Sequence, residues 1–159
     1  YFLNNEMDDF SSKPGVPNMF GLLGNEANSI LPEKRMLSSM TPTIVEKNKK
    51  LYMILGSPGG SKIITSVFQT ILNAYEYGMN IQEAVNSARV HHQWMPDEII
   101  FEPYKFRDSL FSSLESKGYN INYDESVYMG RVDAIMIDDN GLISSGADPR
   151  GDDSSSYLK

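Results

Sequence analysis

The chain has 159 residues, of which 40% are hydrophobic and 22% are charged, a composition typical of one ordinary globular domain. Its formal net charge of -7 and its pI near 4.8 argue against nucleic acid or an anionic membrane surface as a partner. The absence of cysteine excludes disulfides, thiol catalysis and cysteine-bound zinc, and two adjacent histidines are too few for a histidine-rich metal site.

The first ten residues combine carboxylates with apolar side chains. Residues 1–3 are typical of a strand, and the chain begins without methionine, which suggests that a longer polypeptide has lost its front part. Glu6, Asp8 and Asp9 follow, and carboxylates this dense repel one another unless solvent or a cation neutralises them. The segment is therefore either a solvated acidic loop or a surface that faces a substrate ammonium group.

Residues 11–32 are rich in glycine, proline, asparagine and serine, with Phe20 and Leu22 among the few apolar side chains. An ordered loop of about twenty residues without regular structure is uncommon inside a compact domain and is usually functional when it occurs. A lid over a site is one interpretation. A surface loop held by Phe20 and Leu22 is the other.

Two apolar runs predict a β-hairpin over residues 43–55, with a charged turn at residues 46–50. The second run, residues 51–55, is continuously apolar, so we expect it to be buried on both faces. It leads into a turn that contains Gly59 and Gly60. Behind this turn, apolar residues at helical spacing predict a helix over residues 63–75, which Gly78 ends.

The two glycines would therefore lie at a helix N-terminus. Because Gly59 and Gly60 lack Cβ atoms, a reacting group can approach their N–H groups closely, and unpaired donors at this end of a helix favour negative charge. The adjacent hydroxyls of Ser38 and Ser39 are groups that hold a carboxylate. For an isolated pair of glycines, the better interpretation is a plain strand-to-helix turn capped by Ser57 or Ser61.

The second half of the chain predicts further elements. Asn80 with Glu83 predicts a capping box and a second helix. Residues 99–101 predict a short strand, residues 110–114 a third helix, and residues 132–143 a hairpin that turns at residues 138–141. A hairpin, two consecutive helices and then more strands indicate an α+β fold with helices packed on sheet faces.

His91 and His92 lie beside Trp94, the only tryptophan. Adjacent residues point in different directions on a helix or a strand, so this pair is poorly placed to bind one metal ion. We therefore favour histidines that are hydrogen-bonded at a packed junction.

The motifs along the chain resemble one family, the γ-glutamyltransferases (γ-glutamyl transpeptidases, glutathione hydrolases), and within it the small, carboxy-terminal subunit. The segments that carry the resemblance run in the family's order: NEMDDF at 5–10, KPGVPN at 13–18, KRMLSSMTPTIV at 34–45, GSPGGS at 56–61, HHQW at 91–94 and DPR at 148–150. Together they extend from one end of the chain to the other, which makes the resemblance far more specific than any single motif.

The resemblance implies an N-terminal-nucleophile hydrolase fold, a four-layer αββα sandwich in which helices cover two stacked sheets. It implies a precursor that cuts itself, after which the new N-terminal threonine is the nucleophile and its own α-amine the base. A γ-glutamyl-enzyme ester then passes to water, an amino acid or a dipeptide. The implied partners are the large subunit of the same precursor, in a heterodimer, and glutathione or other γ-glutamyl compounds; no cofactor, metal or nucleic acid is expected.

The matching motifs imply which residues form the site. Glu6 and Asp9 would bind the α-amino group of the γ-glutamyl moiety, Ser38 and Ser39 its α-carboxylate, and the N–H groups of Gly59 and Gly60 would form the oxyanion hole. Phe20 lies in the lid loop, where many bacterial members carry a tyrosine, so a hydrogen bond from that hydroxyl is lost while the apolar cover remains. The chain then divides into the amine motif (1–10), the lid loop (11–32) and the core (33–159).

The chain departs from the family at its beginning. The family's nucleophilic threonine and a further substrate-binding asparagine lie upstream of the NEMDDF motif, and its substrate-carboxylate arginine belongs to the large subunit. Four internal threonines cannot substitute, because none follows a self-cleavage site: Thr41, Thr43, Thr65 and Thr70. We therefore expect most of a small subunit, which supplies donor binding and the oxyanion hole but is inactive alone.

Two alternatives remain. One is a related amidase of the same superfamily, such as a cephalosporin acylase or a poly-γ-glutamate-processing enzyme. The other is a non-catalytic module that binds glutamyl ligands. The retained Glu6, Asp9, Ser38 and Ser39 favour the γ-glutamyltransferase, because they form a recognition set for a free γ-glutamyl end. Family members are commonly periplasmic or extracellular, so we expect that location.

Overall fold

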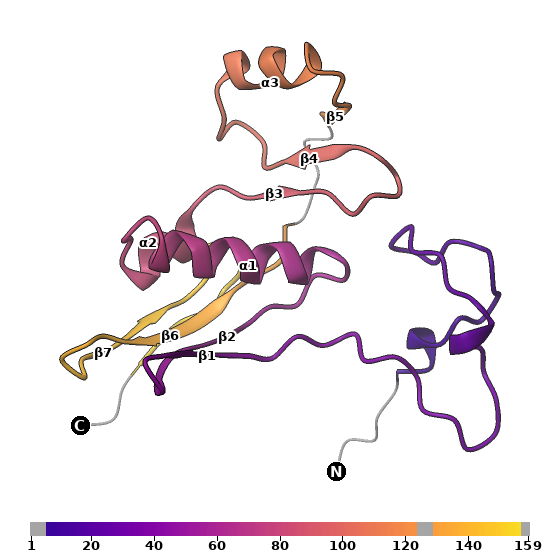
Figure 1. Ribbon diagram of the computed structural model, residues 1–159, viewed down its shortest axis with the longest axis horizontal. Coiled ribbons are helices and arrows are strands. Elements are labelled where there is room, and N and C mark those ends of the chain that lie inside the picture. Colours follow the sequence, from indigo (N-terminus) through magenta and orange to yellow (C-terminus); the bar gives the residue numbers. More distant parts are fainter. Residues whose placement is uncertain (1–5, 124–128, 157–159) are drawn as a thin grey trace. The chain divides into compact units, whose positions relative to one another are not determined.

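The computed structural model describes residues 6–123 and 129–156 (Figure 1). The chain divides into two compact units, Tyr1–Met40 and Thr41–Lys159. The strand expected at residues 1–3 lies outside the described residues. Among the described helices, none has the length and apolar character needed to cross a membrane.

The first unit has little regular structure. It contains two short 3₁₀ helices, η1 (Met7–Asp9) and η2 (Glu26–Asn28), and two isolated β-bridges. Between the helices, the side chain of Asn18 accepts hydrogen bonds from the N–H groups of Phe20 at 2.9 Å and Leu22 at 3.0 Å. A side chain that satisfies nearby backbone in this way stabilises a turn without a sheet or a helix.

The second unit begins with the predicted hairpin. Strands β1 (Thr43–Lys47) and β2 (Lys50–Gly56) pair antiparallel, and Asn48 and Lys49 both have positive φ, at 54° and 62°. Two consecutive residues in this region form the turn that matches the twist of the flanking strands. Strands β6 (Asp133–Ile137) and β7 (Ile143–Gly146) form the second predicted hairpin and complete a sheet of order β1-β2-β6-β7.

One face of this sheet is buried and the other is open. Met53 and Leu55 on β2 are buried, whereas Ile54 between them is 42% exposed. The register places Ile44, Ile54 and Ile135 in one row across three strands, and all three are exposed. The expectation that residues 51–55 are buried on both faces is therefore wrong for the described structure, because within the second unit helices cover only the opposite face.

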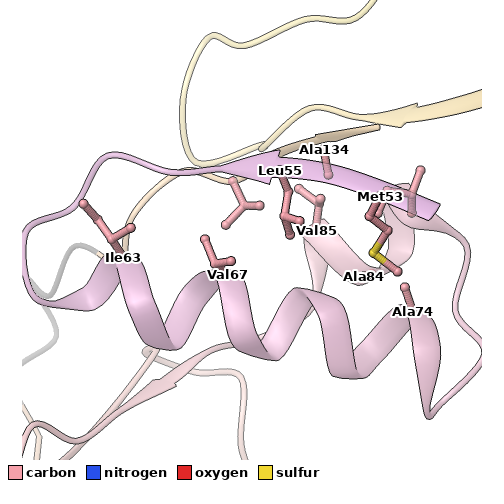
Figure 2. Close-up of a cluster of buried hydrophobic side chains, with 10 residues drawn as sticks. Met53, Leu55, Ile63, Val67, Ala74, Ala84, Val85 and Ala134 are labelled. Atoms are coloured by element: carbon pink, nitrogen blue, oxygen red, sulfur yellow. The ribbon is translucent and has the colours of Figure 1, made fainter. Parts of the chain in front are cut away.

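Helices α1 (Lys62–Tyr75) and α2 (Ile81–Asn86) cover that opposite face. Their apolar sides join β2 and β6 in one core (Figure 2), which consists of Met53, Leu55, Ile63, Val67, Ala74, Ile81, Ala84, Val85, Val132 and Ala134. The predicted capping box is present: the Asn80 side chain accepts from the Glu83 N–H at 2.9 Å, and the Glu83 carboxylate accepts from the Asn80 N–H at 3.0 Å. Gly78, with φ of 67°, lies in the turn between the two helices, as expected.

A second, smaller sheet lies on the far side of α1 (Figure 1). Its order is β3-β4-β5, formed by Val90–His91, Ile99–Phe101 and Ile121–Asn122, and helix α3 (Asp108–Glu115) packs against β5. Helix α1 contacts both β2 and β3, so it is sandwiched between the two sheets. This position brings the N-terminus of α1 close to the segment that follows β3.

Candidate active site

The first unit joins two of the predicted site residues. The hydroxyl of Ser39 donates a 2.8 Å hydrogen bond to Oδ2 of Asp9, although the residues are separated by thirty positions. Asp9 ends the η1 turn, in which its N–H donates to the carbonyl of Glu6. A carboxylate beside an exposed hydroxyl can accept from an ammonium group while the hydroxyl faces a second polar group.

Asn28 connects these segments, and it was not predicted from the sequence. Its amide donates to the carbonyl of Asp9 at 2.7 Å, and its side-chain oxygen accepts from the N–H of Leu37 at 2.9 Å. Asn28 thereby bridges the acidic segment to the chain just before Ser38. An asparagine side chain suits such a bridge, because its amide carries both a donor and an acceptor. Asn28 is 19 positions from Asp9 and 9 from Leu37, so no short sequence pattern indicates the bridge.

The remaining predicted residues of this unit are exposed. Ser38 accepts a long 3.4 Å contact from the N–H of Met40, and within the described residues the Glu6 side chain takes part in no hydrogen bond. Phe20 is 47% exposed, in a loop whose neighbouring apolar side chains are exposed as well. Their proposed roles toward a substrate stay predictions.

In the second unit, Gly59 and Gly60 lie directly before α1, as expected. Both have positive φ, 140° and 59°, and their carbonyls accept from the N–H groups of Lys62 and Ile63. Among the described residues, nothing accepts a hydrogen bond from the N–H groups of the two glycines. Unpaired N–H groups at a helix N-terminus can donate to an anion.

The expected serine caps are wrong. Ser61 occupies the N-cap position of α1 but has helical φ and ψ, and its side chain forms no capping hydrogen bond. Instead, its hydroxyl donates to Oε1 of Gln93 at 2.6 Å, and the Ser57 hydroxyl donates to the carbonyl of Pro58 at 2.6 Å. The side chain of Ser61 is therefore held by a contact with another segment, and not by a local cap.

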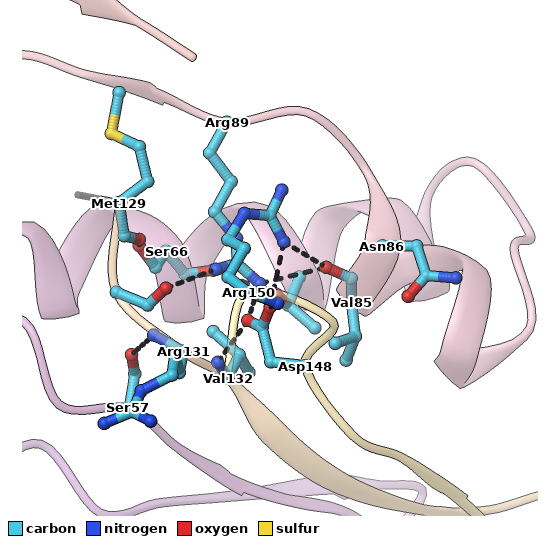
Figure 3. A network of polar contacts seen from close by, with 12 residues as sticks. Ser57, Ser66, Val85, Asn86, Arg89, Met129, Arg131, Val132, Asp148 and Arg150 are labelled. Atoms are coloured by element: carbon cyan, nitrogen blue, oxygen red, sulfur yellow. Dashed lines mark hydrogen bonds and ion pairs between the residues drawn. The ribbon is translucent and has the colours of Figure 1, made fainter. Parts of the chain in front are cut away.

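Gly130 packs against Ser57 and Pro58, at the start of the glycine turn. Its φ is 79°, and a Cβ atom on it would lie 2.8 Å from Oγ of Ser57 and 2.9 Å from the carbonyl oxygen of Pro58. The N–H of Arg131 donates to Oγ of Ser57 at 3.0 Å, a contact drawn in Figure 3. Only glycine allows the 129–131 segment to approach this closely.

The expectation of histidines hydrogen-bonded at a packed junction is confirmed for His91 and wrong for His92. His91 is buried and contacts Thr65 and Gln93. His92 is exposed and lies 2.9 Å from Asp97. Burial lowers the pKa of His91, which keeps it neutral near pH 7. Within the described residues, no three histidine, aspartate or glutamate side chains are grouped so that they could hold a metal ion.

The DPR motif belongs to a buried ion network (Figure 3). Asp148 lies 2.7 Å from Arg89 and 3.1 Å from Arg150, and Arg150 also pairs with Glu102 at 2.6 Å. Burial acts to raise the pKa of Asp148, but N–H groups of Arg150 and Val132 and the charge of Arg89 outweigh it, so this pKa is lowered. Burial also acts to raise the pKa of Glu102. The hydrogen bond and the charge of Arg150 outweigh burial, so the pKa of Glu102 is lowered as well.

This network fixes structure close to the glycine turn. Arg89 is 2% exposed and also donates to the carbonyl of Gly130 at 3.2 Å and to that of Val85 at 3.0 Å. It therefore links the end of α2 to residues 129–131, the segment that packs against Ser57 and Pro58. Its role was not predicted, although the motif that contains Asp148 and Arg150 was recognised.

The fold defines the class of protein. The chain has the N-terminal-nucleophile hydrolase fold, as expected from its motifs. Cephalosporin acylase from Bacillus halodurans has a similar structure, with a TM-score of 0.73 at 24% identity, over 83% of this chain and 25% of that chain. At this identity the likeness shows the fold alone.

The family follows from closer relatives. The chain belongs to the gamma-glutamyltranspeptidase family, whose model matches residues 1–158. The glutathione hydrolase proenzyme of Escherichia coli K12 is 50% identical, over 95% of this chain and 26% of that protein. The structure of gamma-glutamyltranspeptidase from Pseudomonas nitroreducens complexed with L-DON has a TM-score of 0.87 at 42% identity, over 100% of this chain and 82% of that chain. The chain thus spans about a quarter of the length of the curated relatives that it matches.

Proposed function

We propose that this chain is most of the small subunit of an enzyme that hydrolyses and transfers γ-glutamyl groups through a γ-glutamyl-enzyme intermediate. The observation that carries the proposal is the contact between Asp9 and Ser39, which pairs a group for an ammonium with a group for a carboxylate. The relatives named glutathione hydrolase proenzymes support it, because they match nearly the whole chain. A periplasmic or extracellular location is part of the proposal and rests on the family alone.

Donor recognition would use the first unit. A free γ-glutamyl end carries one ammonium and one carboxylate on the same carbon. The single proton of Ser39 cannot serve both Asp9 and a substrate carboxylate, so binding would exchange one hydrogen bond for two charge-assisted contacts. Glu6 would add negative charge for the ammonium, and Ser38 a second hydroxyl for the carboxylate.

Stabilisation of the tetrahedral intermediate would use the second unit. Attack on the γ-carbonyl places negative charge on its oxygen, and the N–H groups of Gly59 and Gly60 are donors with no described acceptor of their own. Loss of one such donor raises a barrier by about 3 to 4 kcal/mol in other enzymes. The attacking threonine, with its α-amine as base, would come from the precursor upstream of this segment.

The large subunit of the same precursor is the proposed partner. The exposed row of Ile44, Ile54 and Ile135 supports this, because a sheet with one open apolar face packs stably against a second sheet. Glutathione and other γ-glutamyl compounds are the proposed donors, and water, amino acids or dipeptides the proposed acceptors.

A steady-state assay on the complete, self-cleaved precursor tests the function. We expect release of glutamate from glutathione and of the amine from a γ-glutamyl anilide. A matched anilide that lacks the α-amino group is the control, and it should be a poor substrate. If the processed protein ignores γ-glutamyl donors and cleaves another amide, the related-amidase alternative replaces this proposal.

A further inference from the structure

A chain of four polar side chains links the glycine turn to the segment after β3. The Ser61 hydroxyl donates to Oε1 of Gln93 at 2.6 Å, and the same oxygen lies 2.9 Å from Nε2 of His91. Nδ1 of His91 lies 2.8 Å from Oγ1 of Thr65. Ser61 and Thr65 are four residues apart, so both ends of this polar chain lie on the same side of the first turn of α1.

The proton positions in this polar chain follow from its contacts. Nε2 of Gln93 donates to the carbonyl of Met95 at 3.0 Å, which requires its Oε1 to face Ser61 and His91. Nε2 of His91 must then carry the proton that Oε1 accepts. Nδ1 is left as an acceptor for the hydroxyl of Thr65, which also lies 3.1 Å from the carbonyl of Lys62 and shares its single proton between the two acceptors. Gln93 is the acceptor at which the contacts of Ser61 and His91 meet.

The glycine turn depends on such outside contacts. Gly59 and Gly60 have little conformational preference of their own, so the directions of their N–H groups are set by what holds the residues on either side. On the preceding side, Arg131 and Gly130 hold Ser57 and Pro58. On the following side, the side chain of Ser61 contacts Gln93 and makes no cap for the helix.

We propose that Gln93 is a positioning residue for the oxyanion-stabilising turn. By holding Ser61, it fixes the N–H groups of Gly59 and Gly60 toward the position of the reacting oxygen, and His91 holds Gln93 in turn. This inference rests on the proposed function of the turn. It goes beyond that function by assigning a role to a side chain outside the set of predicted site residues.

The test uses the complete, self-cleaved enzyme and a γ-glutamyl anilide. Gln93→Met keeps the length of the side chain and removes its acceptor, and Ser61→Ala removes the donor. Each is expected to lower kcat about tenfold or more with little change in KM, because a misplaced donor affects the transition state more than substrate binding. The double variant should be no worse than Gln93→Met alone, because Ser61→Ala breaks a contact that Gln93→Met has already removed. Ser61→Thr retains the hydroxyl and should keep most of kcat.

Gln82→Met is the matched control. Gln82 also bridges two segments of this unit, since its side chain exchanges two hydrogen bonds with the backbone of Ala147. It should leave kcat unchanged even where it lowers the melting temperature. The inference is overturned if Gln93→Met leaves kcat unchanged, if Gln82→Met lowers kcat equally, or if the losses of the two single variants multiply in the double variant.

Failure of the proposed function gives a different result. If the wild-type enzyme cleaves only another amide, the same kcat comparison is made with that amide, because an oxyanion turn serves any acyl transfer. A crystal structure of Gln93→Met needs no catalysis. A displaced Gly59-Gly60 turn supports the inference, and an unmoved turn overturns it.

Discussion

The 2.8 Å hydrogen bond from Ser39 to Asp9 joins the two halves of the predicted donor-recognition set inside one compact unit. Asn28 reinforces this arrangement through the backbone of both segments, at Asp9 and at Leu37. The acidic motif and the serine pair therefore form one structural element, although they are far apart in the sequence. A change in either is expected to affect recognition of the same end of the substrate.

Asp9→Asn should lower kcat/KM for donors with a free α-amino group, because the substrate ammonium loses its counter-charge. The loss should be on the order of 2 to 5 kcal/mol in transition-state stabilisation. Asp8→Asn, which removes an exposed carboxylate from the same turn, is the control and should have little effect. Kinetics with paired donors, with and without the α-amino group, measure this. An equal loss for both donors would mean that Asp9 supports structure and not the ammonium.

Gly130→Ala should reduce both stability and activity, because the new Cβ would overlap Ser57 and Pro58. Gly141→Ala is a close control: its φ of 82° matches the 79° of Gly130, but nothing lies within 4 Å of its Cβ position. Both variants carry the left-handed strain of about 1 to 2 kcal/mol. Only Gly130→Ala should also lower kcat, by about tenfold or more, as the turn is displaced. Equal losses in the two variants would show that the close approach has no role.

Arg89→Met should destabilise the folded protein by about 3 to 5 kcal/mol, because Asp148 and Glu102 would lose a buried counter-charge. Lys47→Met, which breaks the exposed pair with Asp139, should leave the free energy of unfolding nearly unchanged. Equilibrium unfolding in urea compares the two. A loss below about 1 kcal/mol for Arg89→Met would show that the network contributes little to stability.

Stability should decline with acid in two steps. The pKa of His91 is lowered by burial from an ordinary 6.5, so below that pH the unfolded chain binds a proton that the folded chain excludes, and stability falls. The pKa values of Asp148 and Glu102 are also lowered, from 3.8 and 4.5, so their contribution is complete above those values and is lost as pH falls through the lower folded values. The free energy of unfolding, measured against pH, shows both steps.

His91→Asn separates the first step from the second. This variant should abolish the decline that begins near pH 6.5, whereas His92→Asn, at the exposed neighbour, should retain it. An unchanged first step in His91→Asn would assign that step to another group.

Local sequence rules identified much of the fold. Helix α1, the capping box at Asn80 and both hairpins follow from contacts between residues close in sequence, which a short pattern can encode. Strands β3 and β5 were missed because each has two residues, too few to show a period. The open face of β2 was missed because burial depends on which layers cover a strand, and an apolar run cannot show this.

The candidate site was predictable only where a motif named its residues. Asp9, Ser39, Gly59 and Gly60 came from the resemblance to a family, and the structure shows the first two in contact. The roles of the residues that support the site, Gln93 and Asn28, could not be predicted from the sequence. Gln93 lies 32 positions from Ser61, and Asn28 lies 19 positions from Asp9, so neither leaves a periodic or adjacent signal. Their geometry depends on tertiary packing.

The buried ion network also has a consequence for folding kinetics. Arg89 must find Asp148, and Arg150 lies 48 positions from Glu102, so these contacts join segments that are distant along the chain. We expect these side-chain contacts to form late, after the neighbouring strands β4 and β7 have paired. Interactions absent from the transition state slow unfolding and have little effect on the folding rate. The network is therefore expected to slow unfolding of the assembled domain. In stopped-flow measurements, Arg89→Met should leave the folding rate nearly unchanged and should accelerate unfolding.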